Sequence, residues 1–312
     1  MTTVAPRVAD PSASRSRWYS GLLRTLWLLS KGTALAGVRY RITGLAAEAA
    51  FWALLSMPPL MLGLVSSVGR LRGAFSKDEF SDWILQRART VFTEPAVNDV
   101  VKPMLDDVVN GGKVEVVSLG FLLSLWAGSR AVTVYVDTIS IAYGLADVRG
   151  IIRTRVKSFF LYTVGLLVAV IVLPLLVVGP ALVRNTIPGG EFVVQLAYWP
   201  VVVGLSILFL SLLYHLSVPV RTAWWREVPG AVVALLIWIG GSVILRTYLS
   251  GTLSGVSVSA SLAAPIAVMI WLYVAALAVL IGACLNAEVD RLWPGADTAR
   301  ARVAAEVKNQ AF

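Results

Sequence analysis

The sequence LAAEAAFWALLSMPPLMLGL, at residues 45–64, carries one charged side chain, Glu48, in a stretch long enough to cross a membrane. A helix needs about 20 predominantly apolar residues to cross the hydrocarbon core of a bilayer, so this segment predicts a transmembrane helix. Glu48 lies a few residues after the predicted start, where its carboxylate can reach the interface or turn toward another polar group. Pro58 and Pro59 are expected to kink the helix near its middle.

The whole chain has the composition of a polytopic membrane protein. Of 312 residues, 57% are hydrophobic and only 14% are charged, which is unlike a soluble globular domain. The single cysteine, Cys284, and the single histidine, His215, exclude metal sites that need several such ligands. We therefore expect no metal and no other cofactor. The net charge of +9 is expected to face anionic lipid rather than nucleic acid.

Six apolar segments approach or exceed the length of a bilayer span. They predict an all-α polytopic fold with six transmembrane helices, at about residues 44–68, 114–143, 158–183, 192–218, 228–249 and 262–287.

The segments outside these spans differ in character. Residues 1–17 lack apolar periodicity and predict a disordered basic tail, whereas residues 18–42 mix apolar and basic side chains as an amphipathic helix at the cytoplasmic interface does. The predicted transmembrane domain covers residues 43–290, and residues 291–312 form a cytoplasmic tail. Within the domain, residues 69–113 show the apolar spacing of helices. They predict a helical external loop, which either packs over the bundle or offers a gate or a partner surface.

Lysine and arginine are distributed unevenly between the two sides of these spans. The N-terminal region, the loops at 144–157 and 219–227 and the C-terminal tail together hold 17 of the 27 basic residues, and the opposite side holds eight. Cytoplasmic loops carry the basic excess in membrane proteins, so both termini are predicted to be cytoplasmic.

Two charges interrupt the second span. In LWAGSRAVTVYVDTISIAYG, residues 125–144, Arg130 and Asp137 are seven residues apart and share one helix face. A charge at the bilayer centre costs about 2.5–3.5 kcal/mol on insertion scales, so both are candidates for a functional site or a buried polar network. The alternative is that the helix breaks at Gly128 and Ser129 and leaves Arg130 in an irregular segment.

Further polar residues fall in the cytoplasmic half of the predicted bundle. The sixth span ends in LIGACLNAEVDRLW, residues 280–293. If its polar side chains meet those of other spans, they form an inward-facing pocket for a cation, a proton or a basic head group; otherwise they belong to an ordinary solvated helix end. The candidates for this pocket are Glu48, Asp137, Asn286 and Glu288.

Prolines and small residues are expected to shape how the helices pack. Prolines inside spans kink helices, either to build a transport site or for packing alone; those expected to do so are Pro58, Pro59, Pro174 and Pro265. Small residues in GAVVALLIWIGGSVIL (230–245) and AALAVLIGACLNA (275–287) predict close approach of two helices. His215 and Arg246 are expected near the membrane interfaces.

Four blocks carry a resemblance to a known family: AAEAAFWALLSMPPLMLGL (46–64), the block around Arg130 with its Trp-x-x-Ser-Arg pattern, VPGAVVALLIWIGGSVILRTYLS (228–250) and IWLYVAALAVLIGACLNAEVD (270–290). Together they resemble the YihY/BrkB family of bacterial inner-membrane proteins, once called ribonuclease BN. The resemblance implies an inner-membrane protein with six transmembrane helices and cytoplasmic termini. Cys284 stands where the family often has an acidic residue, so an ionic role at that position is not expected here.

Two functions of different classes follow. The first is a transporter or flippase-like exporter of an envelope lipid or another amphiphilic or ionic solute, in which Arg130 contacts an anionic group while Asp137 and Glu48 balance it or relay protons. The alternative is a non-transporting scaffold or regulator of envelope assembly that docks partners on the external loop and the basic N-terminal segment. The expected partners are the bilayer itself and anionic lipids at that basic segment.

We do not expect an enzyme. Ribonuclease activity, the former label of the family, would need carboxylates or histidines clustered around a metal, and the sequence offers no such cluster in a soluble domain.

Overall fold

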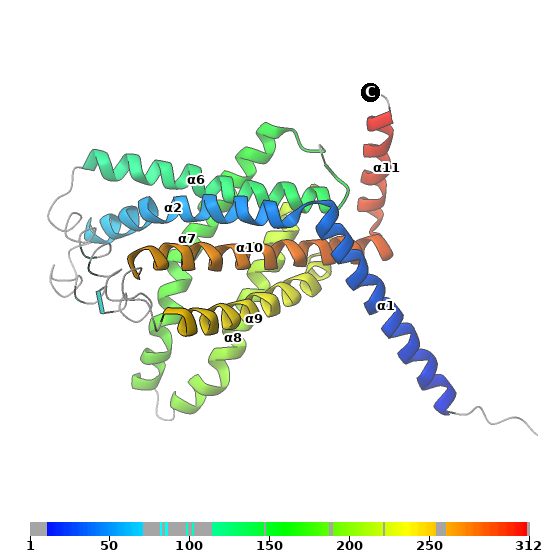
Figure 1. Cartoon of the computed structure of the whole chain (residues 1–312), viewed down its shortest axis with the longest axis horizontal. Helices are drawn as coiled ribbons and strands as arrows, with labels where there is room; N and C mark the ends of the chain where they lie inside the picture. Colours follow the sequence, from blue (N-terminus) through cyan, green and yellow to red (C-terminus); the bar gives the residue numbers. More distant parts are fainter. Residues whose placement is uncertain are drawn as a thin grey trace, which may run out of the picture.

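The computed structural model describes residues 11–70, 114–146, 148–186, 190–220, 222–253 and 260–310, together with Asp82, Leu85, Gln86, Asn98 and Lys102. The regular elements in this part of the chain are all helices (Figure 1), which confirms the predicted all-α class. The predicted external loop at 69–113 lies almost wholly outside the described residues.

Each predicted span coincides with one long helix. These helices are α2 (Ile42–Arg70), α6 (Val114–Ala142), α7 (Ile151–Thr186), α8 (Gly190–Ser217), α9 (Val228–Leu253) and α10 (Ala260–Leu292). Within the described residues, three helical stretches are long and apolar enough to cross a membrane: Tyr198–Ser217, Trp224–Tyr248 and Ile266–Leu292. The described side chains of α2 add an apolar stretch at Ile42–Met57. The chain is therefore a membrane protein.

Two further helices, α1 (Pro11–Arg39) and α11 (Ala296–Gln310), emerge at an angle from one end of the bundle (Figure 1). Helix α1 begins at Pro11, within the segment 1–17 that was predicted as a tail; proline is well suited to the first position of a helix. Arg41, in the left-handed conformation with φ of 52°, forms the turn into α2.

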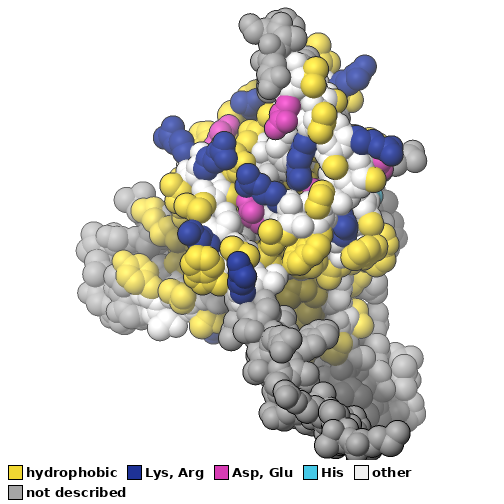
Figure 2. All heavy atoms as spheres, turned by 90° about the vertical axis from the view of Figure 1, so that its right-hand side faces the viewer, with side chains coloured by type: hydrophobic (Ala, Val, Ile, Leu, Met, Phe, Trp, Pro, Cys, Tyr) yellow, Lys and Arg dark blue, Asp and Glu magenta, His cyan; other side chains and the backbone are white. Residues whose placement is uncertain are grey.

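The end of the bundle at α1 and α11 is rich in basic side chains. Figure 2 faces this end and shows more Lys and Arg than Asp and Glu on its surface. The exposed basic residues of α1, the turn after it, the end of α10 and α11 are Arg24, Lys31, Arg39, Arg41, Arg291 and Arg300.

Helices α2, α6, α7 and α10 are continuous through the glycine, serine and proline positions in their interiors. Helix α6 runs through Gly128 and Ser129 without interruption, so Arg130 lies within a regular helix. The prolines predicted to kink the spans also lie within continuous helices: Pro58 and Pro59 in α2, Pro174 in α7 and Pro265 in α10.

Small residues set the packing of the bundle. A methyl group on Gly230 of α9 would collide with the carbonyl oxygen of Gly282 of α10, and one on Gly282 would collide with the carbonyl oxygen of Gly230. The predicted close approach of these two helices is confirmed. Between α2, α6 and α10, the buried core combines small and larger aliphatic side chains: Ile42, Ala46, Ala49, Val134, Ala276, Leu280 and Cys284.

Candidate functional site

Two arginines from different helices lie over one pair of tryptophans. The guanidinium carbon of Arg130, near the middle of α6, is 5.3 Å from the ring centre of Trp52 on α2. That of Arg155, near the start of α7, is 5.8 Å from the ring centre of Trp126. The two indole rings meet edge to face, with their centres 5.3 Å apart. Each guanidinium thus lies within reach of a cation–π contact with an indole ring.

Hydrogen bonds further fix the side chain of Arg155. It donates to the hydroxyl of Thr133, at 3.2 Å, and toward the carbonyl oxygen of Trp126, at 3.5 Å. Thr133 lies one turn after Arg130 on α6, so this hydrogen bond holds Arg155 beside Arg130. The two positive charges repel each other.

The arginine pair has no acidic counter-charge within the described residues. The ion pairs found there involve Arg226, Arg291 and Arg302 instead. Trp126 is 51% exposed, so the pair is accessible from the surface of the bundle. Two like charges on an apolar surface repel each other, and an anionic group bound between them would relieve this repulsion.

A second polar cluster surrounds Glu227, which has 0% of its surface exposed. Tyr143 donates to one carboxylate oxygen, at 2.8 Å, and Thr222 to the other, at 3.1 Å. His215 lies 3.3 Å from the Thr222 hydroxyl through its Nδ1 atom. The cluster thus joins the end of α6, the end of α8 and the start of α9.

Asn286 connects this cluster to α10. Its amide nitrogen donates to the carbonyl oxygen of Glu227, at 2.9 Å, and its amide oxygen accepts from the backbone N–H of Gly230, at 2.7 Å. A cavity of about 10 Å³ lies between this group and Asp290, which is at the lower limit for one water molecule. The cluster is therefore closed and well satisfied, and a substrate has no room in it.

Asp290 holds the C-terminal helix to the bundle. Its carboxylate accepts from Arg302 of α11 at 2.8 Å, from Thr298 at 3.1 Å and from Arg226 at 3.3 Å. Arg302 also donates to the carbonyl oxygen of Tyr143, at 2.9 Å. The carboxylate is 5% exposed and the two arginines about a quarter, so the pairs are only partly screened by solvent.

Arg149 performs a similar joining role in the loop after α6. It donates to the carbonyl oxygens of Ser217, at 2.8 Å, and Val218, and so caps the end of α8. Burial lowers the pKa of Arg149 from its ordinary value because desolvation disfavours the charged form.

The structure gives the predicted site residues separate surroundings. Arg130 stacks on Trp52, Asn286 bonds to α9, and Glu288 pairs with Arg291 at 3.3 Å and packs against Gly32 of α1. Glu48 and Asp137 are exposed, on α2 and α6. That these residues form one cytoplasmic pocket stays a prediction.

Several residues of these clusters were not predicted. Arg155 and Glu227 were both assigned to loops, since each lies beside the start of an apolar segment. An acid immediately before a Val-Pro-Gly helix start is a usable signal for Glu227, because the adjacent apolar span brings it into a buried position. For Arg155 the sequence holds no such signal, because its position depends on how α7 packs against α6.

Comparison with known proteins identifies the relatives of the chain. The family model described as "Virulence factor BrkB" matches residues 38–306. The chain is also similar to the ribonuclease-like protein YfkH of Bacillus subtilis (strain 168), with 25% identity over 251 residues, which cover 78% of this chain and 88% of that protein. No solved structure matches the chain significantly.

Proposed function

The chain belongs to the BrkB family, and from this premise we propose that it is a multi-pass protein of the bacterial inner membrane that transports an envelope lipid or another amphiphilic or ionic solute. In this proposal α2, α6, α7, α8, α9 and α10 all cross the bilayer. The basic end with α1 and α11 faces the cytoplasm, in keeping with the basic excess of cytoplasmic segments.

The observation that carries the proposal is the arginine pair. Arg130 and Arg155 lie over Trp52 and Trp126 without an acidic partner among the described residues. Guanidinium groups bind phosphates and carboxylates by paired hydrogen bonds, and exposed aromatic rings suit the boundary between head group and acyl chain. An anionic amphiphile offers an acidic head group to the two arginines and an acyl chain to the aromatic rings.

No catalytic role is part of this proposal. Glu227 and Asp290 are enclosed by their hydrogen-bond partners, and the described residues contain no group of three or more His, Cys, Asp or Glu that could hold a metal ion. We propose instead that these carboxylates hold α6, α9, α10 and α11 in fixed relation at the cytoplasmic end.

The experiment is a transport assay with purified full-length protein in phosphatidylcholine vesicles. Fluorescent phosphatidylglycerol, which is anionic, and fluorescent phosphatidylcholine, which is zwitterionic, serve as probes, and dithionite reveals how much probe reaches the outer leaflet. We expect faster movement of the anionic probe than in vesicles without protein. If the protein speeds up the movement of neither probe, lipid transport is rejected and the scaffold alternative is favoured.

A further inference from the structure

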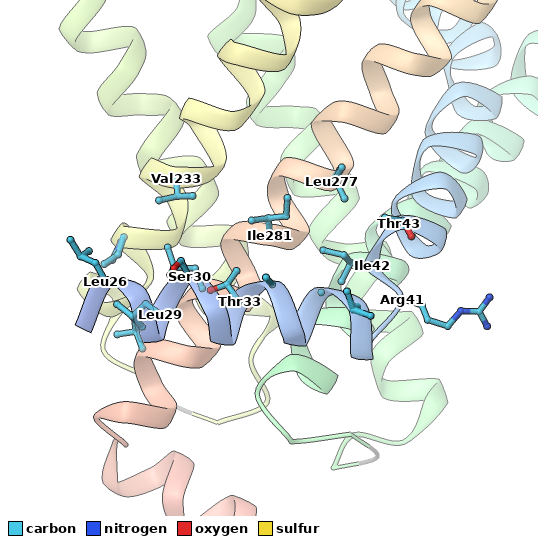
Figure 3. A pocket seen from close by; sticks show the side chains of 16 residues that line it. Leu26, Leu29, Ser30, Thr33, Arg41, Ile42, Thr43, Val233, Leu277 and Ile281 are labelled. Carbon is cyan, nitrogen blue, oxygen red and sulfur yellow. The ribbon is translucent and has the colours of Figure 1, made fainter. Parts of the chain in front are cut away.

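An apolar groove runs between α1 and the bundle. It has a volume of about 940 Å³ and lies between one side of α1 and the ends of α2, α9 and α10. Figure 3 shows α1 crossing these helices, with Val233, Leu277 and Ile281 on the bundle side and Ser30 and Thr33 on α1. On α10 the lining residues follow every fourth position, from Leu277 to Val289, so one stripe of the helix faces the groove.

The size and lining of the groove suit a long aliphatic chain. Its volume is at the upper end of the roughly 300–1,000 Å³ typical of ligand sites. The lining is aliphatic apart from three hydroxyl groups and Arg41, so a polar ligand would leave most of its hydrogen bonds unmade. Because Leu26 and Val38 in its lining are 58% and 79% exposed, the groove is open to the surroundings of the protein.

Charge decides which kind of lipid the groove fits. Helix α1 contains no acidic residue, and Arg24, Lys31, Arg39 and Arg41 are all exposed along it or directly after it. Arg41 lines one end of the groove, and its guanidinium extends outward there (Figure 3). A cluster of basic residues on a helix at the membrane surface attracts anionic lipid.

We propose that this groove binds one acyl chain of an anionic phospholipid, with the phosphate of its head group at Arg41. The lipid fills the space between α1 and α10 and fastens α1 to the bundle. The site shares no residue with the arginine pair. It therefore rests on the membrane location of the chain and not on transport.

The test is native mass spectrometry of the full-length protein in detergent, with dioleoyl phosphatidylglycerol or dioleoyl phosphatidylcholine added. We expect the unaltered protein to retain phosphatidylglycerol at least fivefold better than phosphatidylcholine. Ala34→Phe places a ring in the groove and should reduce retention at least fivefold. Leu35→Phe is the matched control, because Leu35 is exposed on α1 but does not line the groove, and it should retain the lipid.

A second pair of variants tests the head-group contact without filling the groove. Arg41→Gln should remove most of the preference for phosphatidylglycerol, whereas Arg39→Gln should keep it, because Arg39 is exposed on α1 but does not line the groove. Equal retention of both lipids by the unaltered protein, or equal retention by the two phenylalanine variants, would overturn the proposal. If Arg130→Gln loses the bound phosphatidylglycerol while Arg41→Gln retains it, the lipid is bound at the arginine pair and the groove proposal is rejected.

Discussion

The hydroxyl of Tyr143 donates a hydrogen bond of 2.8 Å to the fully buried carboxylate of Glu227. This contact joins the end of α6 to the start of α9, across a large separation in sequence. Together with Thr222 and Asn286, it surrounds a buried carboxylate with hydrogen-bond donors and lets α9 begin inside the protein. The end of the bundle at α1 and α11 is thus held by polar contacts, whereas α2, α6 and α10 pack through apolar side chains, many of them small.

Replacing Tyr143 by phenylalanine should destabilise the protein. The variant keeps the ring but removes one donor from a buried carboxylate, which costs about 1–3 kcal/mol. The measurement is the free energy of unfolding of the purified protein in detergent. Tyr198→Phe is the control, since the Tyr198 hydroxyl makes no hydrogen bond to another described residue. Equal stability of the two variants would show that Glu227 does not depend on Tyr143.

Asp290→Asn should loosen the C-terminal helix. The carboxylate pairs with both Arg226 and Arg302, and removing one partner of a buried pair costs about 3–5 kcal/mol. The arginines are 27% and 25% exposed, so we expect the lower end of that range. Hydrogen exchange should rise throughout α11.

The control for this variant is Asp297→Asn, at an exposed position in the first turn of α11. It should change the stability by less than about 0.5 kcal/mol and leave the exchange of α11 slow. If the amide hydrogens of α11 exchange equally fast in both variants, Asp290 does not hold this helix to the bundle.

Gly230→Ala should disrupt the contact between α9 and α10, because the new methyl group would collide with the carbonyl oxygen of Gly282 and with Asn286. Overpacking of this kind costs about 1–3 kcal/mol. Gly240→Ala, on the same helix, meets nothing within 4 Å and should be neutral or slightly stabilising. The midpoint of a denaturant titration distinguishes the two variants. Equal midpoints for Gly230→Ala and Gly240→Ala would reject the close contact between α9 and α10.

The sequence was sufficient to predict the helical segments and the close approach of α9 and α10. Both depend on local composition: apolar length for the helices, and small residues at Gly230 and Gly282 for their contact. The sequence does not define where α1 begins, because a segment rich in Ser, Ala and Arg has no apolar periodicity; α1 begins at Pro11.

The candidate site was only partly predictable. Arg130 was identified because a charge inside an apolar segment is visible in the sequence, but its partners Trp52 and Arg155 come from other helices. Asn286 was predicted to be part of a polar pocket, but its backbone partners, Glu227 and Gly230, were not identified from the sequence. Which groups meet across helices depends on how each helix is rotated in the bundle, and single-sequence periodicity does not fix that rotation.

The arginine pair gives the most direct prediction about function. Arg130→Gln and Arg155→Gln each remove one charge-assisted contact to an anionic group. Such a contact is worth about 1.5–3 kcal/mol, which corresponds to roughly tenfold or more in affinity. Arg153→Gln is the matched control, because Arg153 is exposed and lies on α7, two residues before Arg155. This variant should behave like the unaltered protein.

The decisive measurement is the rate at which these variants move fluorescent phosphatidylglycerol across vesicles, with equal amounts of folded protein verified by helix content. Transport should fall about tenfold or more in Arg130→Gln and in Arg155→Gln, and it should be unchanged in Arg153→Gln. Full transport by both Arg130→Gln and Arg155→Gln would contradict the assignment of the arginine pair as the anion-binding site.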